Sequence, residues 1–398
     1  MKVLIAGGGI AGLTLAHGLR REDIECEVFE RASREGVRSG YRLTLDADGG
    51  NALEACLPAG PYERYLMASH RTPTRPDVAV VIDSECHELT TAPHIGPPNE
   101  GELPHTAIDR ATFRAILSSD LDDCVRYETP VAGFSAGADG VEVRLSDGRT
   151  TAGDVLVGAD GVGSQVRRRL MPQVGIVPAP VGALGLFGRS PLSEEIIAEL
   201  PEVLSAAFVI ARDARGVMLS LGQCVPRKSG PGVAPAYMML SGGVLPGTAV
   251  PEPAAWDART PHEMHDAMRA GVGGWHPAIR GLVDRIEPET LFSHPFRRLD
   301  PTPPWPSSRV TLVGDSIHAM LPTLGKGANM AMRNAAVLRD HLVAADRGER
   351  PLLEAIAAYE HDMREATYWL MELAADHERF GGGGLRGDAP SAAAEVTA

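Results

Sequence analysis

The sequence is short of positive charge, of cysteine and of long apolar runs, and each shortage excludes a class of protein. It has 38 Lys and Arg against 52 Asp and Glu, which gives a net charge of −14. Such a charge argues against nucleic acid or an anionic membrane as the main partner. The five cysteines are odd in number and show no C-x-x-C spacing, which indicates a reducing compartment and no structural metal site.

The missing apolar runs bear on location. No run reaches about 18 residues, so we expect no segment that spans a membrane. The first residues form a strand that enters a glycine turn, without the basic region or the small-residue cleavage site of a signal peptide. We therefore predict a soluble, cytoplasmic protein. Its 398 residues, 44% hydrophobic and 23% charged, suggest two or three domains with a substantial core.

The clearest pattern lies at the N-terminus. An apolar run of strand length, residues 3–6, breaks into glycines that fit G-x-G-x-x-G, and an Ala/Leu-rich helical pattern follows to Arg20. Gly7 allows the tight turn, Gly9 lets the backbone approach a pyrophosphate, and Gly12 lets the helix pack near the strand. The start of the helix offers free N–H groups to the anion.

A second short strand, residues 26–30, follows this helix and ends in Glu30. The Glu30 carboxylate can accept hydrogen bonds from a ribose 2′-OH, which favours an adenosine without a 2′-phosphate. Because strand, glycines, helix, second strand and acid occur in order, the sequence predicts a site for a ligand with an ADP moiety.

Weaker patterns fill the next hundred residues. A strand at 41–45 precedes a helix at 46–57 that an Asp caps, and residues 58–106 leave the nucleotide-binding part, with an isolated strand at 78–82. The four histidines of that region, at positions 70, 87, 94 and 105, are expected to be surface or loop residues rather than catalytic bases.

Arg110 stands out in the helix that follows. Asp109 is a suitable N-cap, and Phe113, Ile116 and Leu117 have the spacing of one buried face. Arg110 therefore lies in the first helical turn, where the helix dipole disfavours a cation. An anionic partner would stabilise it there, although a solvated arginine fits the pattern equally well.

The rest of the chain contains two more strand–glycine–helix junctions, at residues 154–170 and 309–345. Between them, strand-like runs separated by Gly, Pro and Ser turns suggest an antiparallel sheet, followed by helices at 262–269 and 279–285. Residues 351–380 have a helical pattern, and the glycine-rich tail after them, 381–398, is expected to be disordered.

The three junctions together resemble the fingerprints of the single-component flavoprotein aromatic hydroxylases, the para-hydroxybenzoate hydroxylase-like family of class A flavoprotein monooxygenases. The first is the N-terminal pattern with Glu30; residues 158–161 are similar to the family's "DG" fingerprint, and residues 314–322 with 325–329 are similar to its "GD" fingerprint. The resemblance covers roughly residues 1–345. The third motif departs from the family at Ser316-Ile317, where two small residues are usual, and at Ala319, where proline is frequent.

The resemblance implies how FAD would lie. The pyrophosphate would contact the first motif and the ribose Glu30, with Arg110 nearby; Asp315 would hold the ribityl chain and residues 322–329 the isoalloxazine. Arg42 would run beside the flavin ring, as the one candidate for a catalytic role, and Asp160 would support the fold around FAD and the approach of NAD(P)H. The expected cofactor-binding residues are Gly7, Gly9, Ala11, Gly12, Glu30, Arg31, Arg42, Arg110, Asp160, Gly161, Gly314, Asp315, Pro322, Gly325, Gly327, Ala328 and Asn329.

The implied fold is an α/β protein whose Rossmann-like FAD-binding domain (1–69, 102–178 and 300–345) is interleaved with a mostly antiparallel substrate domain (70–101 and 179–299). A C-terminal helix (346–380) follows, and the protein would be a monomer or a homodimer. The implied reaction uses NAD(P)H and O₂ to hydroxylate an aromatic or polycyclic small molecule through a flavin C4a-hydroperoxide, as a tailoring step of secondary metabolism such as antibiotic biosynthesis. Epoxidation, Baeyer–Villiger oxidation and a non-catalytic FAD-binding protein remain alternatives.

Overall fold

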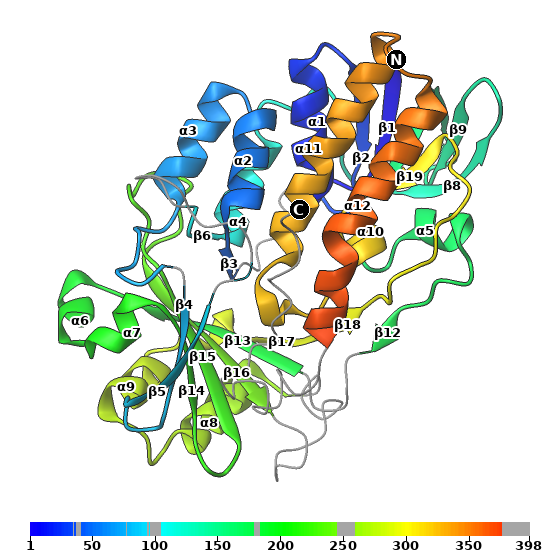
Figure 1. Cartoon of the computed structure of the whole chain (residues 1–398). Helices are drawn as coiled ribbons and strands as arrows, with labels where there is room; N and C mark the ends of the chain where they lie inside the picture. The colour runs from blue at the N-terminus through cyan, green and yellow to red at the C-terminus, as the bar shows by residue number, and fades with distance from the viewer. Residues whose placement is uncertain are drawn as a thin grey trace, which may run out of the picture.

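A parallel sheet forms the first half of the molecule (Figure 1). The computed structural model describes residues 1–34, 36, 41–76, 78–93, 95, 105–178, 184–244 and 259–375. Its five parallel strands stand in the order β19-β11-β1-β2-β7, so the strand of the first motif lies in the centre. Their bounds are β1 (Lys2–Ala6), β2 (Glu25–Phe29), β7 (Val125–Arg126), β11 (Val155–Gly158) and β19 (Val310–Leu312).

Helices cover one face of this sheet and a small antiparallel sheet covers the other. Helices α1 and α11 pack against each other, and α2, α4 and α12 flank them, while the order β10-β9-β8 makes up the small sheet, which contacts β1 and β11. The bounds are α1 (Ile10–Arg21), α2 (Ala47–Cys56), α4 (Arg110–Ser118), α11 (Gly327–Asp346), α12 (Leu352–Ala375), β8 (Val131–Ala136), β9 (Val141–Leu145) and β10 (Thr150–Gly153).

Strands β1 and β11 have no charged residue in their centre, because both faces of each strand are covered. Val3, Leu4, Ile5 and Ala6 of β1 are at most 1% exposed. Continuous apolar runs of this kind are typical of parallel strands buried on both faces. The same argument explains residues 155–157 of β11, which are fully buried.

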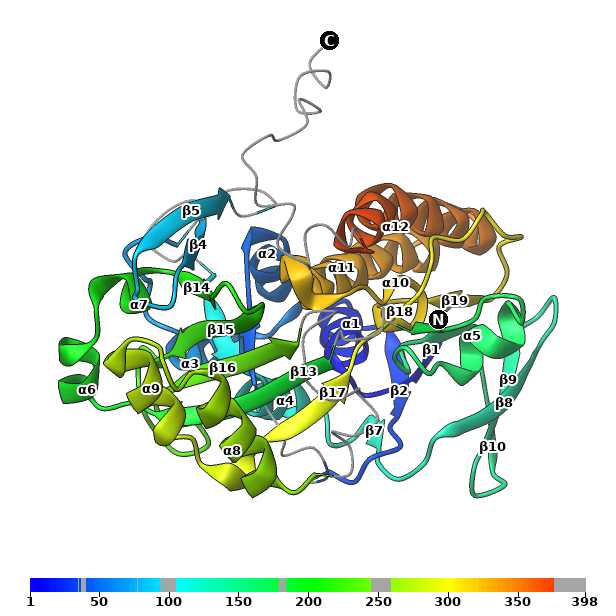
Figure 2. The same ribbon diagram turned by 90° about the horizontal axis from the view of Figure 1, so that it is seen from below.

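A mixed, mainly antiparallel sheet of seven strands forms the second half, in the order β17-β13-β16-β15-β14-β4-β5. Alternation along its strands gives it two different faces: Val209, Leu221 and Met238 pack with α8 and α9 in a core, whereas Phe208 and Met239 lie on the opposite face. Figure 2 shows α8 and α9 beside this sheet. The bounds are β4 (Val78–Ile82), β5 (Glu88–Pro93), β13 (Leu184–Pro191), β14 (Phe208–Arg212), β15 (Val217–Cys224), β16 (Tyr237–Val244), β17 (Phe292–Pro295), α8 (Pro261–Gly271) and α9 (Pro277–Asp284).

A short ribbon connects the two halves. Strands β3 (Arg42–Thr44) and β6 (Ala107–Asp109) pair antiparallel, and both contact β15 of the seven-stranded sheet. The ribbon leads directly into α2 and α4, so the elements that flank the nucleotide motif also touch the second sheet. The remaining elements are α3 (Ala59–Ala68), α5 (Gln165–Leu170), α6 (Glu194–Glu199), α7 (Glu202–Ala206), α10 (Asp315–His318), β12 (Val177–Pro178) and β18 (Arg297–Arg298).

Two expectations from the sequence are wrong. Residues 78–82 form a strand, but it is not isolated: β4 pairs in parallel with β14 and antiparallel with β5. Its sheet partner lies 129 positions along the chain, at Phe208 for Ala79, which no local pattern reveals. His70 is not a surface residue, since it is 4% exposed and its Nδ1 accepts a hydrogen bond from the Val225 N–H at 2.8 Å.

Several features bear on the remaining expectations. The C-terminal helix is present to Ala375, whereas residues 376–380 and the predicted disordered tail, 381–398, lie outside the described residues. In the described part of the chain, no helix is long and apolar enough to cross a bilayer. The same residues contain no group of three or more His, Cys, Asp or Glu side chains that could hold a metal ion.

Candidate FAD and substrate site

The first two motifs meet at Gly7. This residue has φ +110°, and a Cβ built there would lie 2.3 Å from the carbonyl oxygen of Ala159 and 2.9 Å from Cα of Asp160. Both the backbone conformation and the contact therefore require glycine. A Cβ at Gly12 would lie 2.0 Å from the Gly7 oxygen, so that position also requires glycine for the helix to pack on the turn.

The third motif reaches the same turn. Gly314 has φ +67°, and its Cβ would lie 2.9 Å from Cβ of Ala11. Ala11 and Gly12 stand in the first turn of α1, and the three predicted motifs thus surround one helix start. We therefore find the residues of the first, second and third motifs together in space, as the family resemblance implies.

The start of α1 suits an anion. Its N-cap, Gly9, is exposed, makes no side-chain capping bond, and a Cβ there would meet no protein atom closer than 4.0 Å. The first turn contains no acidic residue. The helix dipole and the uncapped N–H groups consequently face open space, which is the arrangement that binds a pyrophosphate.

Glu30 lies beside this helix start and is 8% exposed. Its Oε2 accepts from the Gly8 N–H and its Oε1 from the Ala32 N–H, each at 2.7 Å. These bonds fix the carboxylate while leaving lone pairs for ribose hydroxyls. Arg114, which the sequence did not single out, comes within 3.9 Å of Glu30, whereas the predicted Arg31 is exposed.

Asp315 and Arg110 lie on the opposite side of the site. Asp315 is accessible to solvent, yet burial raises the pKa of its carboxyl while the charge of Arg110 works in the other direction. Burial lowers the pKa of His294 of β17, and the charge of Arg110 adds to this effect, so His294 lies in the neighbourhood of Arg110.

The second motif is tied to the third by a residue that the sequence did not reveal. Oδ2 of Asp160 caps α5 by accepting from the Gln165 N–H at 2.7 Å, and Gly161 has φ +77°. Arg167, 1% exposed, donates from Nη1 to the Ser316 oxygen and from Nη2 to the Val162 oxygen, both at 2.7 Å. Arg167 thereby holds the two loops together.

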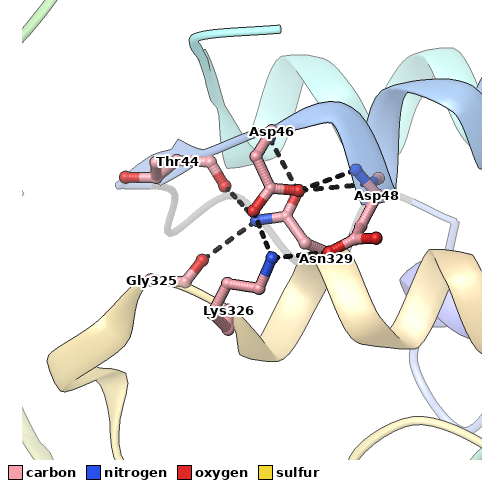
Figure 3. A network of polar contacts seen from close by, with 7 residues as sticks. Thr44, Asp46, Asp48, Gly325, Lys326 and Asn329 are labelled. Atoms are coloured by element: carbon pink, nitrogen blue, oxygen red, sulfur yellow. Dashed lines mark hydrogen bonds and ion pairs between the residues drawn. The ribbon is translucent and has the colours of Figure 1, made fainter. Parts of the chain in front are cut away.

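A buried ion-pair network shapes the loop that carries the third motif (Figure 3). Lys326 is 2% exposed, and its Nζ lies 2.6 Å from Oδ2 of Asp46 and 2.7 Å from Oδ2 of Asp48. The helix dipole disfavours a lysine at the N-cap of a helix, and this irregularity was the available sequence signal. Asp46 in addition caps α2, as predicted, by accepting from the Asp48 and Gly49 N–H groups.

Asn329 completes this network. Its amide donates to the carbonyl oxygens of Thr44 and Gly325 at 3.0 Å each, and its Oδ1 accepts from the Asp46 N–H. The Asn329 side chain is therefore occupied within the protein, and a ligand would meet the backbone of this loop instead. Gly325, with φ +65°, sits over Thr44, while Pro322 is exposed and Gly327 and Ala328 open α11.

Aromatic side chains gather on the face of the seven-stranded sheet that is turned toward this site. Tyr41 stacks on Phe187 with a centroid distance of 4.8 Å and lies 5.9 Å from Phe292. Phe208 and Phe296 extend the group, which we call the aromatic cluster. Arg110 lies over the Tyr41 ring at 5.5 Å and Arg42 over the Phe208 ring at 5.4 Å, so the cluster borders the predicted flavin residues.

These residues fit FAD. The open Gly9 backbone accommodates a pyrophosphate, Glu30 a ribose, and the accessible but surrounded Asp315 a polyhydroxy chain. The network of Lys326 and Asn329 holds the loop that would support the ring system. The assignment of each residue to a part of FAD remains a prediction.

Comparison with known proteins gives the same cofactor. Residues 281–373 match the family model described as FAD binding domain, and residues 5–53 match that of an NAD(P)-binding Rossmann-like domain. A structure described as an FAD-containing monooxygenase from Photorhabdus luminescens superimposes with a TM-score of 0.81 at 26% identity, covering 96% of this chain and 98% of the other.

Two curated relatives are informative. The 3-amino-4-hydroxybenzoate 2-monooxygenase PtmB3 of Streptomyces platensis is 29% identical, over 88% of this chain and 82% of its own length. The dual O-methyltransferase/FAD-dependent monooxygenase CTB3 of Cercospora beticola is also 29% identical, over 93% of this chain, but the chain spans only about half of that protein, 45%. In its motifs, its fold and these relatives, the chain is similar to the FAD-dependent aromatic monooxygenases of the class A flavoprotein monooxygenase family.

Proposed function

We propose that this protein uses NAD(P)H and O₂ to hydroxylate an aromatic small molecule. The observation that supports the proposal is that the aromatic cluster borders the residues predicted to hold FAD: Arg110 lies over the Tyr41 ring, and its charge acts on Asp315. FAD, when bound, takes two electrons from NAD(P)H and activates O₂ for transfer of one oxygen atom. The other oxygen atom leaves as water, so substrate, NAD(P)H, H⁺ and O₂ give hydroxylated product, NAD(P)⁺ and H₂O.

The tasks of the protein are orientation and exclusion of water. The cluster offers flat apolar surfaces, since Tyr41, Phe187 and Phe292 stack with interplanar angles of 17–33°, and planar substrates bind to such surfaces by stacking. Apolar walls also keep water from the reacting centre, where it would favour release of hydrogen peroxide. The protein thus positions the ring, and the cofactor supplies the oxidising power.

The substrate is an aromatic or polycyclic metabolite of a biosynthetic pathway. PtmB3, whose name gives 3-amino-4-hydroxybenzoate as its substrate, supports an electron-rich aromatic ring. A cytoplasmic location, a monomer or homodimer, and the two-domain division given above are also part of this proposal.

The test is turnover of purified, yellow protein with NADPH or NADH under ¹⁸O₂, with a panel of aminohydroxybenzoates, indoles and polycyclic phenols. We expect faster NAD(P)H oxidation with the true substrate class and one ¹⁸O atom in the product. Oxidation that yields only hydrogen peroxide with every ring would contradict hydroxylation. Turnover of simple benzoates alone would contradict the biosynthetic tailoring role.

A further inference from the structure

Arg42 is a surrounded cation whose charge the protein does not neutralise. Its Nε donates to the Gln223 carbonyl oxygen at 2.9 Å and its Nη1 to Thr44 Oγ1 at 2.8 Å, and both acceptors are neutral. Among the described residues it has no carboxylate partner. The side chain is half-buried, and desolvation by the surrounding protein lowers the pKa of its guanidinium.

The sequence makes room for this side chain. A Cβ at Gly222 of β15 would lie 2.9 Å from Cδ of Arg42 and 3.0 Å from the Phe208 ring. Glycine at this point of a strand is otherwise unfavourable, and it often marks a close approach of another group. Gly222 therefore lets Arg42 cross from β3 to the seven-stranded sheet, where its guanidinium lies over Phe208 at 5.4 Å.

The neighbouring groups that favour the charged form of Arg42 carry no negative charge themselves. The neighbours that favour its charged form are the thiol of Cys224 and the phenol of Tyr237, and burial raises the pKa of both, so they are neutral at pH 7. The charge of Arg42, in turn, helps to lower the pKa of His70, which is neutral as well. Arg42 is half-buried, and Asp109, which lies opposite it in the β3–β6 ribbon, is paired with Arg189 at 2.7 Å. An acidic ligand is therefore a suitable partner for the charge of Arg42.

We propose that Arg42 binds the acidic group of the substrate, and hence that this enzyme acts on an aromatic acid whose ring lies against the aromatic cluster. The free Nη2 of Arg42 offers the hydrogen bond, and the ring of Phe208, a member of the aromatic cluster, lies beside the guanidinium. This inference rests on the proposed function, since it names the substrate class of the same site.

Two sources could provide the anion, namely the substrate and the reduced flavin ring. The oxidised isoalloxazine is neutral, so it leaves Arg42 without a counter-charge in the resting enzyme. An acidic substrate supplies that charge before any electron transfer. The two sources therefore differ in the oxidation state in which Arg42 acts, and binding to the oxidised holoenzyme separates them.

The experiment compares matched acids and amides on oxidised, FAD-loaded protein without NAD(P)H. Dissociation constants of 2-aminobenzoate and 1-hydroxy-2-naphthoate, and of their carboxamides, are measured from the change in flavin absorbance. We expect at least one of the acids to bind at least tenfold more tightly than its amide. Arg42→Gln should reduce that ratio to about one with little effect on the amide, and Arg42→Lys should keep part of it.

Two further variants separate charge from fold. Gly222→Ala keeps the charge of Arg42 but displaces its side chain, so it should also reduce the acid-to-amide ratio. Arg42→Lys keeps a cation at position 42 and is the control that the site still folds. Arg110→Gln removes the cation over the Tyr41 ring and should weaken FAD binding while the acid-to-amide ratio persists.

Three results would overturn the proposal: acids that bind no better than amides or not at all, a ratio that persists in Arg42→Gln, or an Arg42→Gln variant that changes only the flavin reduction potential. Because no turnover is involved, the outcome is independent of the ¹⁸O₂ experiment. Acid binding through Arg42 without oxygen transfer would refute the proposed function alone.

Discussion

Two cations lie at strand β3, Arg42 within it and Lys326 beside it, and their partners differ. Lys326 is paired with two carboxylates, Asp46 and Asp48, whereas Arg42 is bonded only to neutral oxygens. Thr44 joins them, since its carbonyl accepts from Asn329 beside Lys326 and its hydroxyl accepts from Arg42. The paired cation builds the loop that would hold the flavin, and the unpaired cation faces the aromatic cluster. By this difference we assign the charge of Lys326 to the stability of the fold and the charge of Arg42 to ligand binding.

The largest expected effect separates the two cations by stability. Lys326→Met leaves Asp46 and Asp48 unpaired in a buried place, and removing one partner of a buried ion pair costs about 3–5 kcal/mol. Arg42→Met removes an unpaired charge and should change the free energy of unfolding by less than about 1 kcal/mol. Urea unfolding of both variants and the wild type measures this. Equal losses would break the comparison.

The side of the molecule with the paired cation also contains a buried base, His318, which is fully buried and has its pKa lowered to about 4 by burial. In the unfolded chain the imidazole of His318 titrates near pH 6.5, so between pH 6.5 and 4 the unfolded state binds more protons than the folded state. Stability should therefore fall as the pH drops through this window, by roughly 3 kcal/mol at most.

His318→Gln is the control for this titration. Its free energy of unfolding should be lower than that of the wild type at pH 7.5 but should depend less on pH between 6.5 and 4. Urea unfolding at four pH values measures the difference. The same slope in both proteins would show that other groups cause the acid sensitivity.

A smaller effect divides the two carboxylates of the network. Asp46 pairs with Lys326, caps α2 and is fully buried, whereas Asp48 only pairs with Lys326 and is partly exposed. Asp46→Ala should cost about 1–2 kcal/mol more than Asp48→Ala, because an N-cap contributes about 1 kcal/mol and the deeper charge is less screened. Thermal unfolding of the two variants tests this order, and a larger loss for Asp48→Ala would reverse it.

The same contrast explains how much the sequence predicted. Gly7 and Gly314 were predictable because a positive φ and a close contact demand glycine, and local spacing records such demands. Asp46 and Asp109 were predictable as caps because the cap bonds span three residues. The Lys326–Asp46 pair joins positions 280 apart and the Arg42–Gln223 bond positions 181 apart, so only the folded chain reveals them.

The aromatic cluster shows the same limit. Tyr41, Phe187 and Phe292 come from three distant segments, and each alone is an ordinary apolar residue of a strand or loop. Met238 and Met239 are neighbours in one apolar run, and no local feature of the sequence distinguishes them. The structure divides them, because alternation along β16 puts Met238 in the core and Met239 on the face of the cluster.

The most direct test of the account is the affinity of the apoprotein for FAD. It is measured by the quenching of flavin fluorescence in the wild type and in the variants Glu30→Ala, Asp315→Ala and Arg42→Gln. The account predicts at least tenfold weaker binding for Glu30→Ala and for Asp315→Ala, which carry the first and third motifs. Arg42 is predicted to lie beside the flavin ring, but the oxidised ring is neutral, so Arg42→Gln should weaken the binding of oxidised FAD less than either carboxylate variant does. Wild-type affinity in both the Glu30 and Asp315 variants would contradict the assignment of these motifs to one FAD site.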